Sequence, residues 1–109
     1  MDISNISDFT GGWFIGDFSP TLDATPHAEV CLKRYPAGTT EPVHYQHVAT
    51  EYTLVISGRC RIGDVELGPD DILRIPPGEA AGFEALEDVV LIAVKTPSLP
   101  DDKVVGYPE

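Results

Sequence analysis

The chain has 109 residues, of which 42% are hydrophobic, and its 18 acidic and 7 basic side chains give a formal net charge of −11. This length and composition suit one globular domain with a modest core and argue against a disordered chain. The negative charge argues against nucleic acid and anionic membrane surfaces as partners, although a local basic pocket could still hold a small anion.

The N-terminal segment MDISNISDF is acidic and polar, which is unlike a secretory signal. No apolar run approaches the roughly 20 residues that a membrane span needs. The two cysteines, Cys31 and Cys60, are far apart and form no C-x-x-C pattern. We therefore expect two buried, reduced thiols in a cytoplasmic protein, with a disulfide or a zinc site as the alternative.

Ten glycines and ten prolines divide the chain into short segments, which is typical of β-structure. No window has a helical period. The predicted strands, in chain order, are Gly12–Phe18, Ala28–Tyr35, Val43–His47, Glu51–Ser57, Arg59–Gly63, Val65–Leu67, Ile72–Ile75, Ala80–Glu84 and Val89–Lys95.

Turn residues separate these strands. The Gly63-Asp64 pair predicts a tight hairpin, because it tolerates the positive φ angles that such a turn requires. Many short antiparallel strands predict an all-β sandwich or small barrel. We expect one domain, residues 1–109, with its core at about residues 10–97 and flanking tails of weak periodicity that are loosely held or lie against a partner.

The segment from Gly38 to Gly58, GTTEPVHYQHVATEYTLVISG, contains the candidate site residues His44, His47 and Glu51. Histidine and carboxylate side chains at short strand spacing are suitable ligands for a divalent metal. The segment therefore indicates a metal site or a polar pocket on neighbouring strands.

This segment and a later one, GPDDILRIPPGEAAGF, resemble the two sequence motifs of the cupin superfamily. The first motif reads glycine, five residues, His-x-His, three or four residues, glutamate, six residues and glycine. Gly38, His44, Glu51 and Gly58 match it. The resemblance covers roughly residues 35–94 and implies an all-β, double-stranded β-helix (jelly-roll) barrel of the small cupin type.

The resemblance also implies a metal held by three histidines and a glutamate. His44 and Glu51 occupy two of those four places, whereas Gln46 stands at the second histidine and Ala81 at the histidine of the second motif. The metal-ligand set is therefore degenerate. Iron, manganese, nickel or zinc bound by His44, Gln46 and Glu51 is one expectation, and a metal-free polar pocket is the other.

His47 has two possible positions. In a regular strand, residues i and i+2 share a face, so Gln46 points inward with His44 while His47 points away. A β-bulge at Tyr45-Gln46 would instead turn His47 inward and give a set of two histidines and one carboxylate. Regular alternation favours a surface position for His47.

Other residues are candidates for the pocket wall. Arg34 alternates with Leu32 and Val30 and could face inward to hold a ligand anion, or it could be exposed. Phe83 lies near Ala81 on the strand of the second motif, where core packing is the alternative. No residue is identified as catalytic.

These observations predict a protein that binds a small molecule. If it is an enzyme, we expect a metal-dependent isomerase, epimerase or oxygenase that acts on a sugar or small organic acid. The alternative is a non-catalytic, ligand-binding or metal-free domain. Apolar residues on both faces of Tyr52–Ile56 and Val89–Val94 indicate burial on both sides, so we expect a homodimer.

Overall fold

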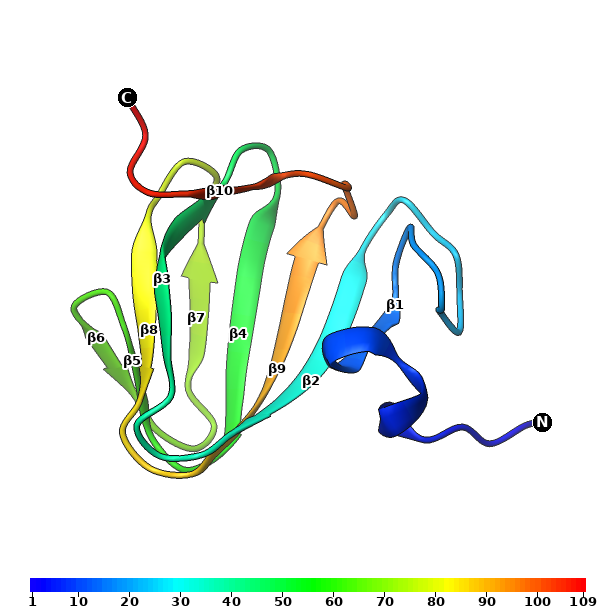
Figure 1. Ribbon diagram of the computed structural model, residues 1–109, viewed down its shortest axis with the longest axis horizontal. Helices are drawn as coiled ribbons and strands as arrows, with labels where there is room; N and C mark the ends of the chain where they lie inside the picture. The colour runs from blue at the N-terminus through cyan, green and yellow to red at the C-terminus, as the bar shows by residue number, and fades with distance from the viewer.

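The computed structural model describes all residues, 1–109, as two five-stranded antiparallel sheets (Figure 1). Two 3₁₀ turns, η1 (Ile6–Asp8) and η2 (Thr10–Gly12), precede the strands. In spatial order the first sheet contains β1 (Trp13–Ile15), β2 (Glu29–Tyr35), β9 (Val89–Thr96), β4 (Thr50–Ser57) and β7 (Ile72–Ile75). The second contains β10 (Lys103–Val105), β3 (Thr40–Gln46), β8 (Ala81–Ala85), β5 (Cys60–Ile62) and β6 (Val65–Leu67).

The predicted all-β fold is confirmed, and the strands lie close to their predicted ranges. The predicted hairpin also forms: Ile62 faces Val65 across a two-residue turn in which Gly63 has a φ of 56°. No helix is long and apolar enough to cross a membrane.

Two elements differ from the sequence prediction. The tail after Pro97 forms an additional strand, β10, which pairs with β3 through Lys103 and Gln46. In addition, β3 starts at Thr40 and includes a bulge. Glu41 pairs with Phe83 of β8 and His44 pairs with Ala81, so three residue steps on β3 lie opposite two on β8.

The hydrophobic core lies between the sheets. One buried cluster contains Val55, Cys60, Leu67, Ala85 and Val89. A smaller one contains Cys31, Leu91 and Ala93. Of the 109 residues, 15 are buried. Both cysteines are free and buried, as predicted.

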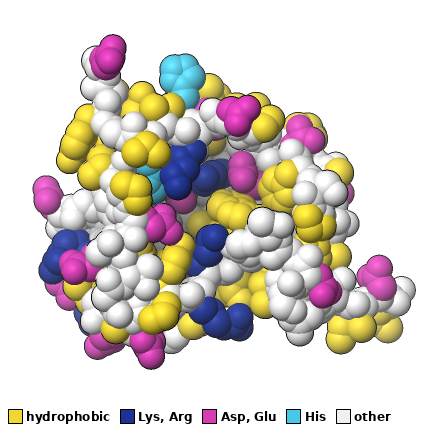
Figure 2. Space-filling model, in the orientation of Figure 1, with side chains coloured by type: hydrophobic (Ala, Val, Ile, Leu, Met, Phe, Trp, Pro, Cys, Tyr) yellow, Lys and Arg dark blue, Asp and Glu magenta, His cyan; other side chains and the backbone are white.

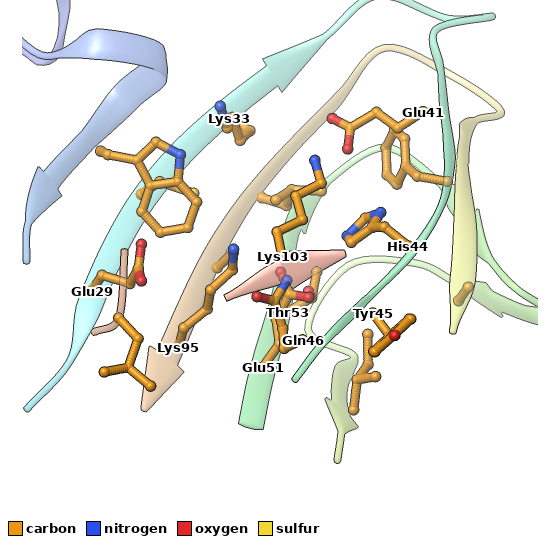
Figure 3. Close-up of a pocket in the computed structure, with 18 of the residues that line it drawn as sticks. Glu29, Lys33, Glu41, His44, Tyr45, Gln46, Glu51, Thr53, Lys95 and Lys103 are labelled. Atoms are coloured by element: carbon orange, nitrogen blue, oxygen red, sulfur yellow. The ribbon is translucent and has the colours of Figure 1, made fainter. Parts of the chain in front are cut away.

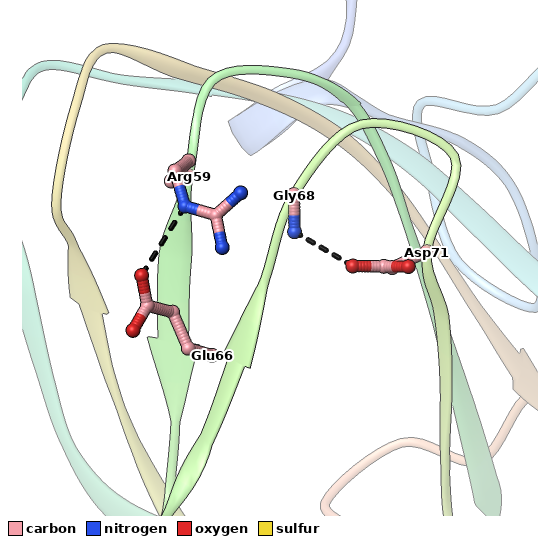
Figure 4. Close-up of polar contacts among 4 residues, drawn as sticks. All are labelled: Arg59, Glu66, Gly68 and Asp71. Carbon is pink, nitrogen blue, oxygen red and sulfur yellow. Dashed lines mark hydrogen bonds and ion pairs between the residues drawn. The ribbon is translucent and has the colours of Figure 1, made fainter.

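The β5–β6 hairpin belongs to the end of the barrel that contains the first cluster (Figure 4). Arg59 Nε lies 3.2 Å from Glu66 Oε1 across this hairpin. In the following turn, the backbone N–H of Gly68 donates to Asp71 Oδ2 at 2.8 Å. The ion pair is about half exposed, so it contributes at most about 1 kcal/mol. This end is closed mainly by apolar packing.

Candidate functional site

A cavity of about 520 Å³ lies between the two sheets. Figure 2 shows a hollow near the middle of one face, with basic and acidic side chains around apolar ones. Its polar wall comes from several strands of both sheets (Figure 3), namely Glu29, Lys33, Glu41, His44, Tyr45, Gln46, Glu51, Thr53, Lys95 and Lys103. The size suits a small molecule.

The strand β2 lines the cavity through alternate residues, Glu29, Cys31, Lys33 and Tyr35. Arg34 therefore faces away and is exposed, whereas the sequence analysis considered it an inward candidate. Neighbouring residues of a strand point to opposite faces, so Lys33 and Arg34 lie on opposite faces of β2. The basic residue that β2 supplies to the cavity is Lys33.

Most of the other predicted site residues line this cavity. His44 and Gln46 come from β3, Glu51 from β4, and Ala81 and Phe83 from β8. His47 does not line it: the residue is exposed beyond the end of β3, and its N–H donates to the carbonyl oxygen of Asp102 at 2.9 Å. The bulge of β3 lies before His44 and not at Tyr45-Gln46, so it does not turn His47 inward.

The bulge instead brings Glu41 to the cavity wall together with His44. The Tyr35 hydroxyl donates to Glu41 Oε1 at 2.5 Å. Burial, followed by the contact with Glu41, raises the pKa of Tyr35 above its usual range, so this phenol stays neutral. Glu41 was not among the residues predicted from the sequence, although Pro42 within a strand is a signal for a bulge.

The donors of the cavity do not fit a metal ion. No group of three or more histidine, cysteine, aspartate or glutamate side chains in the chain is arranged to bind one. Gln46 and Ala81 stand where the motif has its second and third histidines, and Ala81 provides no ligand. The set of His44, His47 and Glu51 is not formed, because His47 is outside the cavity. We therefore derive no chemistry through a metal.

Three lysines supply the positive charges of the cavity, beside five carboxylate side chains that also line it, namely Glu29, Glu41, Glu51, Glu79 and Asp101. Lys33, Lys95 and Lys103 are the only lysines in the chain, and all three line the cavity. Neither of the two ion pairs in the structure involves a lysine. The Nζ atoms of Lys95 and Lys33 lie 4.9 and 5.8 Å from the centre of the Trp13 ring. Cation–π attraction therefore holds these two ammonium groups beside one aromatic side chain.

Carboxylates lie next to these lysines. Lys95 faces Glu29 on one neighbouring strand and Glu51 on the other. Burial raises the pKa of Glu29, while the charge of Lys95 opposes this shift. The site thus alternates acidic and basic groups across three strands.

Gln46 is the most unusual polar residue of the wall. It is 4% exposed, and its Nε2 is buried without a hydrogen-bond partner. A buried donor that stays without a partner costs about 1–3 kcal/mol.

The sequence matches no family model and no curated protein. Its structure, however, is similar to solved structures. A conserved protein of Klebsiella pneumoniae with a double-stranded β-helix domain is 20% identical and has a TM-score of 0.69, with 77% of this chain and 74% of that chain covered. An RmlC-like cupin protein from Desulfovibrio desulfuricans is 17% identical over 69% of this chain and 76% of that one, with a TM-score of 0.61.

The third similar structure is the DMSP lyase DddQ from Ruegeria pomeroyi, which is 23% identical with a TM-score of 0.64. The match covers 78% of this chain but 46% of that one. These likenesses show that the chain has the double-stranded β-helix fold of the cupins, as its two motifs predicted.

Proposed function

We propose that this cupin-fold protein binds a small polar molecule in its cavity through direct contacts with its own side chains. The observation that carries the proposal is a cavity of about 520 Å³ whose wall contains charged groups without ion-pair partners and one buried, unpartnered amide. A cavity that combines charged, polar and apolar side chains in this way is the kind of site that binds a small polar molecule.

The metal-dependent isomerase, epimerase or oxygenase that the sequence resemblance implies receives less support. The cavity offers one histidine and the single glutamate of the motif, while Gln46 and Ala81 occupy the other two ligand places. A fold shared with enzymes does not determine a reaction. We place the protein in the cytoplasm, consistent with its two free, buried thiols.

A second candidate function, metal-independent proton transfer, is favoured by Glu41 and His44, which both line the cavity. Tyr35 donates a hydrogen bond to Glu41 and would fix the orientation of that carboxylate toward a ligand. A carboxylate and an imidazole within one cavity are the groups that general acid–base catalysis uses.

The proposal is tested by measuring metal content and ligand binding on the same samples. Wild type, His44→Ala and Glu51→Ala are purified without chelator and analysed for iron, manganese, nickel and zinc. Binding of a panel of neutral and anionic small metabolites is then followed by the signals of Trp13, the only tryptophan, which lines the cavity. We expect substoichiometric metal in all three proteins and ligand binding that survives treatment with EDTA.

Stoichiometric metal in the wild type that is absent from both variants would contradict ligand binding by side chains alone. It would favour the metal-dependent enzyme. Metal-free protein whose Trp13 signals respond to no member of the panel would contradict the proposed function itself.

A further inference from the structure

Building on the proposed function, we infer that the ligand is a small hydroxylated carboxylic acid whose carboxylate is held by the lysines of the cavity. The first step is the distribution of positive charge. The protein has a net charge of −11, yet its three lysines all face the same cavity. Two of the four arginines, Arg59 and Arg61, pair with glutamates at the surface, and no lysine lies within 4.0 Å of a carboxylate.

The second step is that two of the ammonium groups are held in place before any ligand binds. Lys33 and Lys95 come from adjacent strands, β2 and β9, and both lie against the ring of Trp13. Figure 3 shows the side chains of Lys33 and Lys95 on these two strands. Side chains held in this way lose less conformational freedom when they bind an anion.

Lys103 and Gln46 are further hydrogen-bond donors of the cavity wall. Lys103 of β10 lies directly opposite Gln46 of β3 in the strand register, and both line the cavity. Nε2 of Gln46 is buried and has no acceptor. Both side chains are hydrogen-bond donors on the cavity wall, and a carboxylate accepts several hydrogen bonds at once.

The fourth step is the presence of acceptors beside these donors. Glu29 and Glu51 flank Lys95 across the sheet, and both side chains line the cavity. Ionised carboxylates only accept hydrogen bonds, so the ligand must also carry donors. Hydroxyl groups provide donors without adding charge. A chain of about six carbons with a terminal carboxylate and several hydroxyls fits both sets of groups within the roughly 520 Å³ available.

Three probes of equal chain length separate these requirements. Gluconate carries a carboxylate and hydroxyls, sorbitol carries only hydroxyls, and hexanoate carries only the carboxylate. Each is titrated into the full-length protein by calorimetry, and the indole N–H signal of Trp13 reports whether binding occurs in the cavity. We expect gluconate to bind at least about tenfold more tightly than either of the other probes, with an affinity that falls as salt is added.

Variants identify the residues that bind. Lys33→Met and Lys103→Met should each weaken gluconate binding by about tenfold or more, because each removes a charge-assisted hydrogen bond. Arg34→Met is the matched control, since it removes the same charge from the same strand but faces away from the cavity. It should change the affinity by less than about twofold. Circular dichroism checks that the variants fold.

Equal binding of sorbitol and gluconate would overturn the inferred ligand class and leave small-molecule binding intact. Hexanoate that binds as tightly as gluconate would overturn the requirement for hydroxyls. Equal losses in Arg34→Met and Lys103→Met would show that the overall charge, and not the cavity lysines, attracts the anion. A cavity that responds only to other molecules of the metabolite panel would also overturn the inference while preserving the proposed function.

Discussion

At the scale of single residues, the two glycines that bound the first motif meet different demands. Gly58 follows β4 with a φ of +79°, and a Cβ atom there would lie 2.0 Å from the carbonyl oxygen of Asp88. Gly38 also has a positive φ, +89°, but a Cβ atom there would meet nothing within 4 Å. Gly58 is therefore required both for its backbone conformation and because a side chain would clash with Asp88. Gly38 is required for its backbone conformation alone.

These two positions form a matched pair of substitutions. Gly38→Ala should lower the free energy of unfolding by about 1 kcal/mol, which is the cost of a left-handed backbone with a side chain. Gly58→Ala should lower it by about 3 kcal/mol or more, because the backbone of the neighbouring strand must also move. Urea denaturation measures both values. Equal losses in the two variants would contradict the steric role of Gly58.

The candidate site could be predicted from the sequence only in part at this scale. His44 and Gln46 line the cavity and His47 does not, in line with alternation in β3, but Tyr45, which alternation places on the other face, lines it as well. The same rule does not say which face of β2 is the inner one, because apolar residues occur on both. Lys33, and not Arg34, lines the cavity for that reason.

At the scale of elements, β10 is attached to the barrel by Asp102. This residue is 8% exposed, and its two carboxylate oxygens accept hydrogen bonds from the N–H groups of Val48 and Ala49, both at 2.9 Å. Its own carbonyl oxygen accepts from the N–H of His47. The loop between β3 and β4 is thereby connected to the strand that carries Lys103.

Asp102→Ala should lower the free energy of unfolding by about 1–3 kcal/mol, because it leaves two amide N–H groups without acceptors. It should also weaken anion binding, since Lys103 loses its fixed position. An exposed aspartate outside the cavity provides the control: Asp70→Asn tolerates the positive φ of 74° at that position and should be close to neutral. Chemical denaturation and gluconate titration measure the two effects, and a neutral Asp102→Ala would argue against this attachment.

At the scale of the whole molecule, the outer face of the first sheet is apolar. Leu32, Ile92, Leu54 and Ile72 lie opposite one another on four successive strands, β2, β9, β4 and β7. Ile72 is 66% exposed and Ile56 is 46% exposed. We propose that a second copy of the chain covers this face, because the row crosses nearly the whole sheet and matches the two-sided apolar runs of the sequence.

Size-exclusion chromatography with light scattering should therefore give a mass about twice the 11.8 kDa of one chain. Ile72→Glu should shift the protein toward the monomer, since it introduces a charge into the proposed interface. Val65→Glu, at a comparably exposed position on the β5–β6 hairpin of the other sheet, should leave the mass unchanged. A stable wild-type monomer would refute the proposed dimer.

The sequence by itself determined the all-β fold, the strand positions and the cupin type of barrel. These depend on local signals, namely alternation, glycine and proline turns, and the spacing around Gly38, Glu51 and Gly58. Two absent histidines, replaced by Gln46 and Ala81, also showed that the metal-ligand set is degenerate.

Only the tertiary structure decided which charged residues meet. Lys33, Lys95 and Lys103 are as many as 70 residues apart in the sequence, and β10 carries no periodicity that would predict its pairing with β3. The bulge that brings Glu41 beside His44 likewise depends on the register between β3 and β8. Strand pairing over long sequence separations determines which of these charged residues are neighbours. For this reason the cavity of lysines and carboxylates could not be predicted from the sequence alone.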